Sequence, residues 1–413
     1  MIDFDTIVIG GGAAGIAAAR RLHEAGIDVL IVEARDRLGG RAWTVSGSHG
    51  FALDAGCGWL HSADRNPWTD IAVTQGRRLD KSKPPWARTS MTRLFPETEQ
   101  QSFRRAMAGF FDRLGPAAAS GRDRPAADLL NPGDRWNPLL NAAATYITGA
   151  EFDRVSAIDL DRYEDSEINW RIAEGYGTTI AAHGHGLNVK LNCPVTAIDH
   201  GGRHLRIETG QGMLRAERAI VTLPTDVLAG CENFFAPKLP DKTRAAAGLP
   251  LGLADKLFMT LNDADEFEID SRLFGSTDRT ATGSYHFRPL GRPMIEAYFG
   301  GTLAHELERG GERAFFDFAT TELTGLLGSE FARRLKPLFL HQWAKDPFAS
   351  GSYSYAIPGS AGERAVLAAP VESRIFFAGE ACSPHDFSTA HGAYQSGIAA
   401  AEQLIAADAF TKS

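Results

Sequence analysis

The most regular pattern of apolar and polar positions lies at the start of the chain. Residues 5–9 (DTIVI) form an apolar run, and the glycine-rich segment GGGAAG follows at 10–15. Small and apolar residues then recur on one face of a helical pattern that ends at Gly26, and a second apolar run ends at Glu33. This succession predicts a strand, a helix and a second strand, the opening of a βαβ unit.

The pattern changes in the middle of the chain. Residues 76–171 alternate charged and proline-rich stretches with helical periods, so we predict a mainly helical region there. Apolar runs typical of strands return at 187–224 and at 254–299. A helical stretch follows at about 303–334.

The end of the chain repeats the order of the opening. RIFFAGE (374–380) predicts one more strand, and STAHGAYQSG (388–397) begins the last helix. Ser388 or Thr389 is expected to cap that helix, because their side-chain oxygens accept free backbone N–H groups. Small residues at this first turn let a ligand approach the backbone, and the helix dipole there favours electron-rich atoms.

Composition narrows the classes of protein. The chain has 413 residues, of which 44% are hydrophobic and 23% charged, enough for two core-forming units. Its net charge of −8 does not indicate a nucleic-acid partner. No apolar run is long enough to cross a membrane, and no basic-then-apolar leader precedes the first strand. We therefore expect a cytoplasmic protein; nothing in the sequence indicates its oligomeric state.

Cysteine spacing argues against a metal site. The four cysteines, at 57, 193, 231 and 382, show no CxxC pattern. Zinc sites and redox disulfides of the thioredoxin kind need such closely spaced pairs. We expect neither in this chain.

The glycine-rich segment fits a dinucleotide-binding turn. Gly10, Gly12 and Gly15 follow a strand and open a helix, and Glu33 ends the next strand. Such glycines allow a tight turn and let backbone N–H groups reach a pyrophosphate, while the carboxylate accepts hydrogen bonds from ribose hydroxyls. In isolation the glycines indicate only a tight turn, and the surrounding strand, helix and acid favour the dinucleotide.

Two further segments favour FAD over NAD. In EARDRLGGR (33–41), Gly40 and Arg41 suggest a second close approach to the cofactor, and Arg35 and Arg41 can offset phosphate charge. A basic surface loop is the alternative for this stretch alone. Glu380 ends a strand directly ahead of the last helix, where it can accept hydrogen bonds from a ribityl chain.

With these segments together, the chain resembles the flavin-containing amine oxidase family of monoamine oxidases, polyamine oxidases and histone lysine demethylases. The resemblance is weakest across 76–160 and 262–340. Two of its motifs, GxGxxG and EARDRLGGR, also fit carotenoid desaturases and protoporphyrinogen oxidases. The segments that carry it are GGGAAG (10–15), EARDRLGGR (33–41), DAGCGWLH (54–61), EGYGTTI (174–180), PVTAI (194–198), AIVTLP (219–224), WAKDPFASGSYSY (343–355) and FAGEACSPHDFSTAHGAYQSG (377–397).

The order of elements and the resemblance both predict an α/β fold in two domains. The first is a Rossmann-like FAD-binding domain built from both ends of the chain, over residues 1–75, 172–240 and 343–413. The second is an α+β substrate-binding domain with a mixed sheet and helices, over 76–171 and 241–342.

The resemblance implies contacts along the nucleotide part of FAD. It places Glu33 on the adenosine ribose and the backbone of Val195 beside the adenine. Arg35 and Arg41 are implied near the phosphates and the ribityl chain, and Glu380 on the ribityl or phosphate groups.

It also implies contacts around the flavin. Gly58 and Trp59 are placed along the ring, Trp343 is placed near it, and Thr389 and Ala390 meet its pyrimidine edge. For Trp343, packing in a core is an equal explanation.

Lys256 is the first catalytic candidate. KLFMTL (256–261) is similar to the family strand that carries a lysine near flavin N5, where it positions a water. Strand alternation puts Leu257, Met259 and Leu261 on one face and Lys256 on the other, which by itself favours a solvated surface lysine, whereas the resemblance favours the lysine near the flavin.

Tyr353 and Thr389 are the other two candidates. The resemblance makes Tyr353 one wall of an aromatic cage that orients an amine, with packing in a strand as the alternative. Thr389 stands where monoamine oxidases have the second tyrosine, which implies a wider pocket on that side. Ser352 stands where they have the cysteine joined to the flavin, so the resemblance implies non-covalent FAD.

The implied activity is oxidation of a C–N bond in a small amine or polyamine. Hydride passes to flavin N5, the imine hydrolyses, and O2 reoxidises the flavin and yields H2O2. Alternatives are a desaturase or oxidase of C–C bonds in an apolar substrate, a demethylase of a protein lysine, or a flavin-binding protein without turnover.

Three features have two interpretations each. His61 contacts substrate or is a hydrogen-bonded structural histidine. His391 is expected to support the helix start rather than to act as a base. The acidic segment 159–167 (DLDRYEDSE) attracts a polycationic amine or is a solvated loop.

Overall fold

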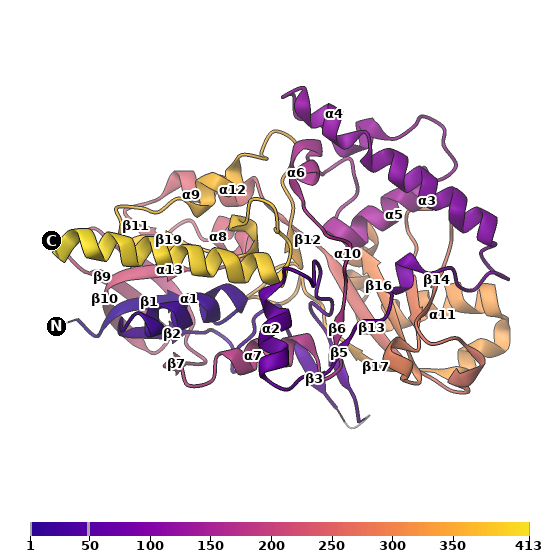
Figure 1. Cartoon of the computed structure of the whole chain (residues 1–413), viewed down its shortest axis with the longest axis horizontal. Coiled ribbons are helices and arrows are strands. Elements are labelled where there is room, and N and C mark those ends of the chain that lie inside the picture. Colours follow the sequence, from indigo (N-terminus) through magenta and orange to yellow (C-terminus); the bar gives the residue numbers. More distant parts are fainter. Residues whose placement is uncertain (1, 48–49, 413) are drawn as a thin grey trace.

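The computed structural model describes residues 2–47 and 50–412. Residues 1, 48–49 and 413, which belong to the predicted FAD-binding ranges, lie outside the described residues. Both described ends of the chain lie at one side of an elongated molecule (Figure 1). Among the helices of the described residues, none combines the length and the apolar character needed to cross a bilayer.

An eight-stranded mixed sheet occupies the side that holds the two ends. Its path is β11–β8–β9–β10–β1–β2–β7, with β19 paired to β10. β1 runs parallel to β2 and β10, and β10 runs parallel to β19, so distant segments of the chain share one sheet. The strands are β1 (Phe4–Ile9), β2 (Val29–Val32), β7 (Val189–Lys190), β8 (Val195–Asp199), β9 (Leu205–Thr209), β10 (Gly212–Val221), β11 (Phe235–Ala236) and β19 (Ile375–Phe377).

The first and last helices lie side by side on one face of this sheet (Figure 1). They are α1 (Ala13–Glu24) and α13 (Ala390–Lys412). Small residues allow the close approach: a Cβ added to Gly397 would lie 2.2 Å from the carbonyl oxygen of Ala14. The opposite face is covered by α8 (Thr225–Gly230), α9 (Pro240–Ala247) and α12 (Glu363–Ala368).

A five-stranded sheet forms the other side of the molecule, in the order β14–β15–β16–β13–β17 and antiparallel at each pairing. Leu257, Met259 and Leu261 pack on one face against two helices, as the alternation predicts. The bounds are β13 (Ala254–Leu261), β14 (Ser271–Phe274), β15 (Ser284–Phe287), β16 (Met294–Gly300), β17 (Leu335–Leu340), α10 (Gly301–Gly310) and α11 (Glu312–Leu327).

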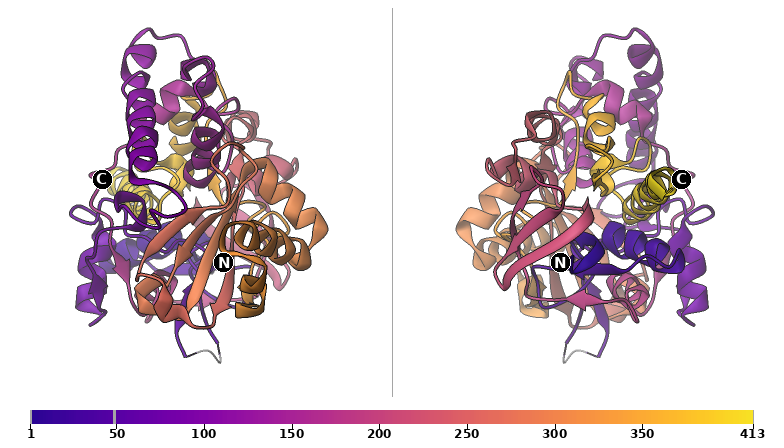
Figure 2. Two further views of the ribbon diagram at one scale, coloured as in Figure 1. Left: turned by 90° about the vertical axis from the view of Figure 1, so that its right-hand side faces the viewer. Right: turned by 90° about the vertical axis from the view of Figure 1, so that its left-hand side faces the viewer.

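The predicted helical region stands above the five-stranded sheet (Figure 2). It lies on the side of the free face, which is the face that does not pack against α10 and α11. Its helices are α3 (Glu97–Phe111), α4 (Leu114–Ala119), α5 (Asn137–Thr148) and α6 (Ala157–Arg162). Two short strands that the pattern does not predict, β5 (Leu79–Asp80) and β6 (Arg171–Ile172), pair with each other and bring the two ends of the region together. Strand β17 is likewise unpredicted.

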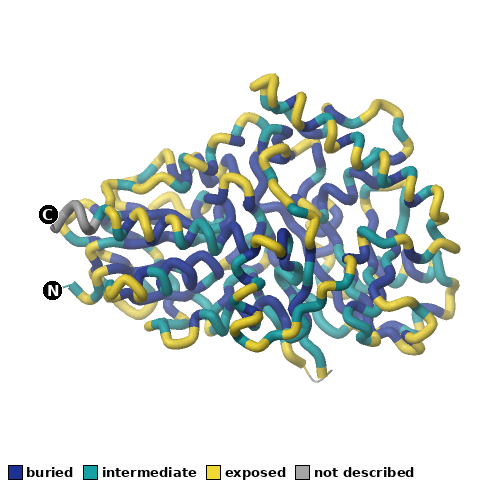
Figure 3. Tube along the Cα trace, viewed as in Figure 1, coloured by how far each residue is buried: buried dark blue, intermediate teal, exposed yellow. Residues whose placement is uncertain are grey.

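Short elements join the two sides. The pairs β3 (Thr44–Ser46) with β4 (Ala52–Asp54) and β12 (Leu251–Gly252) with β18 (Tyr353–Ser354) are antiparallel, and the remaining helices of eight residues are α2 (Pro67–Thr74) and α7 (Tyr176–His183). Many residues in the interior of both sides of the molecule are buried (Figure 3). The α/β class with a mixed sheet is confirmed, while the domain boundaries and the Rossmann-like character stay predictions.

Candidate active site

A cavity of about 1670 Å³ is lined by elements of both sheets. The ends of β1 and β2, the start of α13, strand β18 and the free face of the five-stranded sheet all contribute to its wall. Every residue predicted for the site lines this cavity except Gly15. Gly15 instead packs behind the glycine-rich turn, where an added Cβ would lie 1.9 Å from the carbonyl oxygen of Gly10.

The glycine-rich turn leaves room on its cavity side. Gly10 has φ +107°, a conformation that favours glycine, and its turn leads into α1. A Cβ added to Gly12 would meet no protein atom nearer than 4.0 Å, so it would occupy cavity space. The N–H of Gly39 donates to the carbonyl of Gly11 at 2.8 Å, which brings the second glycine segment against the first.

Glu33 and Arg35 are held in place by the protein. Glu33 is buried, and its two carboxylate oxygens accept the N–H of Gly11 at 2.6 Å and the N–H of Arg35 at 2.9 Å. The guanidinium of Arg35 pairs with Asp346 at 2.7 Å. Asp346, which the sequence analysis missed, follows Trp343 in the same motif, but its partner lies more than 300 positions away.

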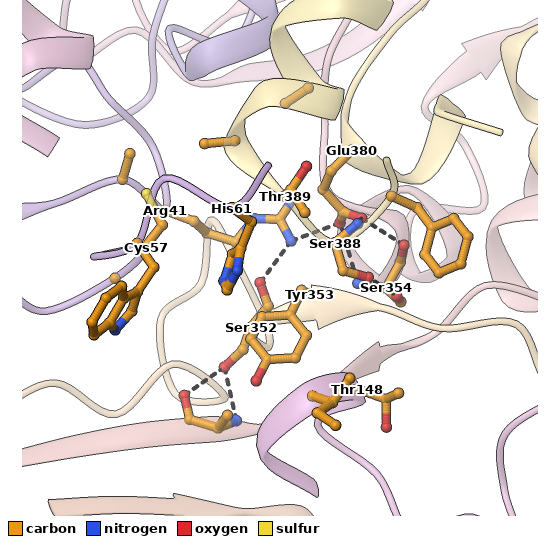
Figure 4. A pocket seen from close by; sticks show the side chains of 18 of the residues that line it. Arg41, Cys57, His61, Thr148, Ser352, Tyr353, Ser354, Glu380, Ser388 and Thr389 are labelled. Carbon is orange, nitrogen blue, oxygen red and sulfur yellow. Dashed lines mark hydrogen bonds and ion pairs between the residues drawn. The ribbon is translucent and has the colours of Figure 1, made fainter. Parts of the chain in front are cut away.

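Arg41 and Glu380 form the central ion pair of the cavity wall. Nη1 of Arg41 donates to Oε1 of Glu380 at 2.9 Å and to the carbonyl of Ser352 at 2.8 Å (Figure 4). Glu380 also accepts the hydroxyl of Ser354 and the N–H of Ser388. Burial alone would raise the pKa of Glu380, but Arg41 and Ser354 stabilise the charged form and lower it.

Thr389 is the residue that caps α13. Its hydroxyl accepts the N–H of Gly392 at 2.9 Å and donates to the carbonyl of Asp386 at 2.6 Å. Because its single hydroxyl proton is engaged, Thr389 presents mainly backbone and methyl to the cavity. His391 is buried and lies 3.1 Å from a carboxylate oxygen of Asp386, which agrees with its expected role in supporting the helix start.

Lys256 is buried rather than solvated. Its Nζ donates to the carbonyl of Asp54 at 2.9 Å and lies 3.3 Å from a carboxylate oxygen of Glu296. A Cβ added to Gly58 would lie 3.3 Å from this Nζ, so the glycine lets the ammonium reach the cavity wall. Burial alone would lower the pKa of Lys256, but Glu296 and Tyr298 raise it. The surface-lysine interpretation is therefore wrong.

Tyr353 belongs to a cluster of three tyrosines. Its hydroxyl donates to the carbonyl of Tyr146 at 2.7 Å and lies 3.3 Å from the hydroxyl of Tyr298. Burial raises the pKa of Tyr353 well above its usual range, so it stays a neutral phenol. Tyr298, which the sequence analysis missed, stands opposite Lys256 on the neighbouring strand. The alternation in MIEAYFG could have indicated it, since Glu296 and Tyr298 share one face there.

Two indole side chains, those of Trp343 and Trp59, line the cavity. Nε1 of Trp343 donates to the carbonyl of Ala55 at 3.2 Å, and its ring is buried. Trp59 makes an edge-on contact with Trp86, with ring centroids 4.6 Å apart, and carries Arg171 over its face. Both rings are fixed by protein contacts before any ligand arrives.

His61 and part of the acidic segment reach the cavity. Nδ1 of His61 lies 2.6 Å from Oδ1 of Asn169, and burial lowers the pKa of His61. Asp159, Asp161, Asp165 and Glu167 also line the cavity, and Asp159 is buried there in an ion pair with Arg364. The solvated-loop interpretation of 159–167 therefore does not hold for Asp159.

The sequence is similar to a known family over most of its length. The profile of flavin containing amine oxidoreductases matches residues 13–77 and 94–405, most of the chain. The chain belongs to this family. Members of the family use FAD, so the cofactor of this amine oxidoreductase is FAD.

Individual relatives are similar over nearly the whole chain. Polyamine oxidase 2 of Arabidopsis thaliana is 30% identical over 96% of this chain and 87% of its own length, and polyamine oxidase 4 of Oryza sativa subsp. japonica is 29% identical over 96% and 88%. Lysine-specific histone demethylase 2 of Homo sapiens is 24% identical over 97% of this chain, but over only 53% of its own length.

The residues present fit FAD. The open space beside Gly12 suits a pyrophosphate, and the buried carboxylate of Glu33, which two backbone N–H groups hold in place, suits a ribose hydroxyl. Val195 lines the same cavity, and its place beside the adenine stays a prediction. The start of α13, with Ala390 at its first turn, supplies the positive end of a helix dipole.

Ser352 bears on how FAD would be held. Its hydroxyl donates to the carbonyl of Ala254 at 2.9 Å and accepts the N–H of the same residue at 2.9 Å. The free thiol of Cys57 lines the cavity, and burial raises its pKa to about 12, which keeps it protonated and a weak nucleophile. Non-covalent FAD stays a prediction.

Proposed function

We propose that this amine oxidoreductase oxidises a C–N bond of a small amine or polyamine and passes the electrons to O2. The observation that carries the proposal is the buried Lys256, held by Asp54 and Glu296 at the wall where Gly58 opens the way to the cavity. When bound, FAD supplies the two-electron acceptor for the hydride of the carbon next to nitrogen, and O2 then yields H2O2.

The side chains of the chain position the substrate rather than activate it by strong acid or base. The neutral rings of Tyr353 and Tyr298 offer faces that orient an amine. The raised pKa of Lys256 keeps this residue cationic, so it holds a water by donating hydrogen bonds and does not accept a proton. An amine that arrives deprotonated needs no further base.

The wall of the cavity supports an amine as substrate. Asp161, Asp165 and Glu167 line it and favour a cationic chain approaching the site. Relatives named polyamine oxidases agree with such a substrate. Charged lining residues argue against the alternative of an apolar C–C substrate.

An anaerobic titration tests the proposal. The purified holoenzyme is mixed without oxygen with primary amines, secondary amines and polyamines, and the flavin absorbance is followed. Bleaching by an amine supports the proposal, and fast return of colour with H2O2 in air identifies O2 as acceptor. A flavin band that no amine bleaches contradicts it.

Acid precipitation tests the mode of FAD attachment. With Ser352 in place of a cysteine beside the flavin, we expect the yellow colour to stay in the supernatant. Colour in the washed pellet would show a covalent bond.

A further inference from the structure

Arg272 on β14 reaches the cavity with most of its hydrogen-bonding capacity unused. Its Nε donates to the hydroxyl of Ser284 at 2.8 Å, and its Cζ lies 4.4 Å from the centre of the Phe274 ring. Neither Nη has a hydrogen-bond or ion-pair partner within the part of the chain that the structure describes. Since a guanidinium has five N–H donors, the outer fork with four of them is open to the cavity.

The acidic side chains of this region are already paired. Asp270, two residues before Arg272, is bound by both Nη groups of Arg171 at 2.8 Å and lies 2.9 Å from His286. Glu296, on the same face of the sheet, pairs with Lys256. Neither carboxylate pairs with Arg272.

The other arginines of the cavity wall have partners inside the protein. Arg35 pairs with Asp346, and Arg41 pairs with Glu380. Arg104 lies within hydrogen-bond distance of the hydroxyl of Thr89 and donates to a backbone carbonyl. Among these four arginines, Arg272 is the one whose fork is open.

An enclosed guanidinium without a counterion is unfavourable. Burial lowers the pKa of Arg272 to about 10, and Tyr146 is the one neighbour that opposes this. The hydroxyl of Tyr146 donates to the carbonyl of Thr282, so it stays neutral and does not supply the missing charge. A bound anion would supply it.

We propose that Arg272 binds a carboxylate of the substrate through its two Nη groups, so that the substrate is an amine that also carries a carboxylate. This inference rests on the proposed amine oxidation and names its substrate class. Nε is fixed by Ser284 and the plane is fixed by the ring of Phe274. A guanidinium fork fixed in this way matches a carboxylate with two parallel hydrogen bonds.

The sheet separates this carboxylate from the reacting carbon. Lys256 pairs with Tyr298, Tyr298 with Ser284, and Ser284 with Phe274, so β14 is three strands from β13. Three strand spacings amount to about 14 Å, of which the long side chain of Arg272 bridges part. An α-amino acid carries its carboxylate on the oxidised carbon itself. The spacing therefore points to a carboxylate several carbons from the amine.

Matched substrates test the inference. We would compare 5-aminopentanoate with pentylamine, 1,5-diaminopentane and the isomer 2-aminopentanoate in the anaerobic flavin-bleaching assay. With the wild-type holoenzyme, 5-aminopentanoate should be oxidised with the highest kcat/KM. In Arg272→Met this value should fall about 10- to 100-fold, with little change for pentylamine. Arg272→Lys, which keeps the charge but not the fork, should lie between.

Two controls accompany these variants. Arg313→Met removes an exposed arginine of α11 far from the cavity and should leave all rates unchanged. Ser284→Ala removes the partner of Nε and should weaken 5-aminopentanoate alone, which covers the case that Arg272→Met fails to fold. Flavin absorbance and thermal unfolding verify that each variant is folded.

The outcomes separate this inference from the proposed function. Suppose that pentylamine or diaminopentane bleaches the flavin at least as well as 5-aminopentanoate does, and that Arg272→Met changes none of these rates. This result overturns the carboxylate site but leaves amine oxidation intact. If the wild-type holoenzyme oxidises 2-aminopentanoate with the highest kcat/KM, the inference that the carboxylate lies several carbons from the amine is overturned. If no amine bleaches the flavin, calorimetric titration with 5-aminopentanoate decides: weaker binding to Arg272→Met supports the carboxylate site, and equal or absent binding overturns it.

Discussion

Ionic side chains at the two ends of the cavity differ in whether they have partners within the protein. At the end where we propose that FAD binds, which is called the cofactor end, Glu33, Arg35, Arg41 and Glu380 all have partners within the protein. At the end where we propose that the substrate binds, which is called the substrate end, the fork of Arg272 has no partner among the described residues. Charges that orient a cofactor are most effective when they are fixed in advance, whereas an open fork gains its partner only from a ligand. Stability should therefore depend on the first end and ligand selection on the second.

The largest expected effect concerns a buried pair behind the cofactor end. Arg364 and Asp159 are joined by two bonds of 2.7 Å, and Arg364 also donates to Ser354, which binds Glu380. Arg364→Leu leaves Asp159 buried and unpaired and should lower the free energy of unfolding by about 3–5 kcal/mol. Arg272→Leu removes one hydrogen bond, to Ser284, and should lower it by at most about 1.5 kcal/mol. Urea unfolding measures both.

If Arg272→Leu lowered the free energy of unfolding as much as Arg364→Leu does, the two ends of the cavity would not differ in their contribution to stability. The double variant Asp159→Asn/Arg364→Leu provides the control, because it removes the unpaired charge and should regain part of the lost stability.

The next effect concerns the lysine between the two ends. If Lys256 is the fixed cation beside the flavin that we propose, Lys256→Met should slow flavin reduction or reoxidation about 100-fold. Stopped-flow absorbance measures both half-reactions. Lys256→Met/Glu296→Gln, which also removes the unpaired carboxylate, should recover stability but not rate. Wild-type rates in Lys256→Met would show that Lys256 has no catalytic role.

A smaller effect is expected for FAD affinity. Arg41→Met removes the partner of Glu380 and a donor to the carbonyl of Ser352. FAD should bind about 10-fold more weakly, as measured by fluorescence on reconstitution of the apoprotein. If Arg272→Met weakened FAD as much as Arg41→Met does, the two ends of the cavity would not be distinct.

The smallest effect depends on pH. The folded-state pKa of Glu380 is lowered from its ordinary value of 4.5, so its ionised form stabilises the fold. This contribution is complete above pH 4.5 and is lost as the pH falls toward the folded-state pKa. Glu380→Gln should therefore be less stable than wild type at pH 7, by about 1 kcal/mol, and the difference should shrink by pH 3.5. A thermal-unfolding difference that does not depend on pH would contradict this.

Local sequence determined the elements and most of the cofactor side of the site. The opening βαβ order, the strands of 254–299 and the last helix follow from periodicity, because side chains alternate along strands and recur every 3.6 residues along helices. The glycine-rich turn and Glu33 were predictable for the same reason, since they lie within about 25 consecutive residues. The resemblance to a family, and not periodicity, indicated Lys256, whereas the place of Glu380 between a strand and the last helix indicated that residue.

Only the tertiary structure decided which side chains share the cavity and which are left without a partner. Alternation places Glu296 and Tyr298 on one face of β16, but it does not say that this face meets Lys256. Arg41 and Glu380 are 339 positions apart, and their pairing exists only because both ends of the chain enter one sheet. The same reason applies to Arg272. Whether its guanidinium has a partner depends on the side chains around it, and distant segments bring those side chains together.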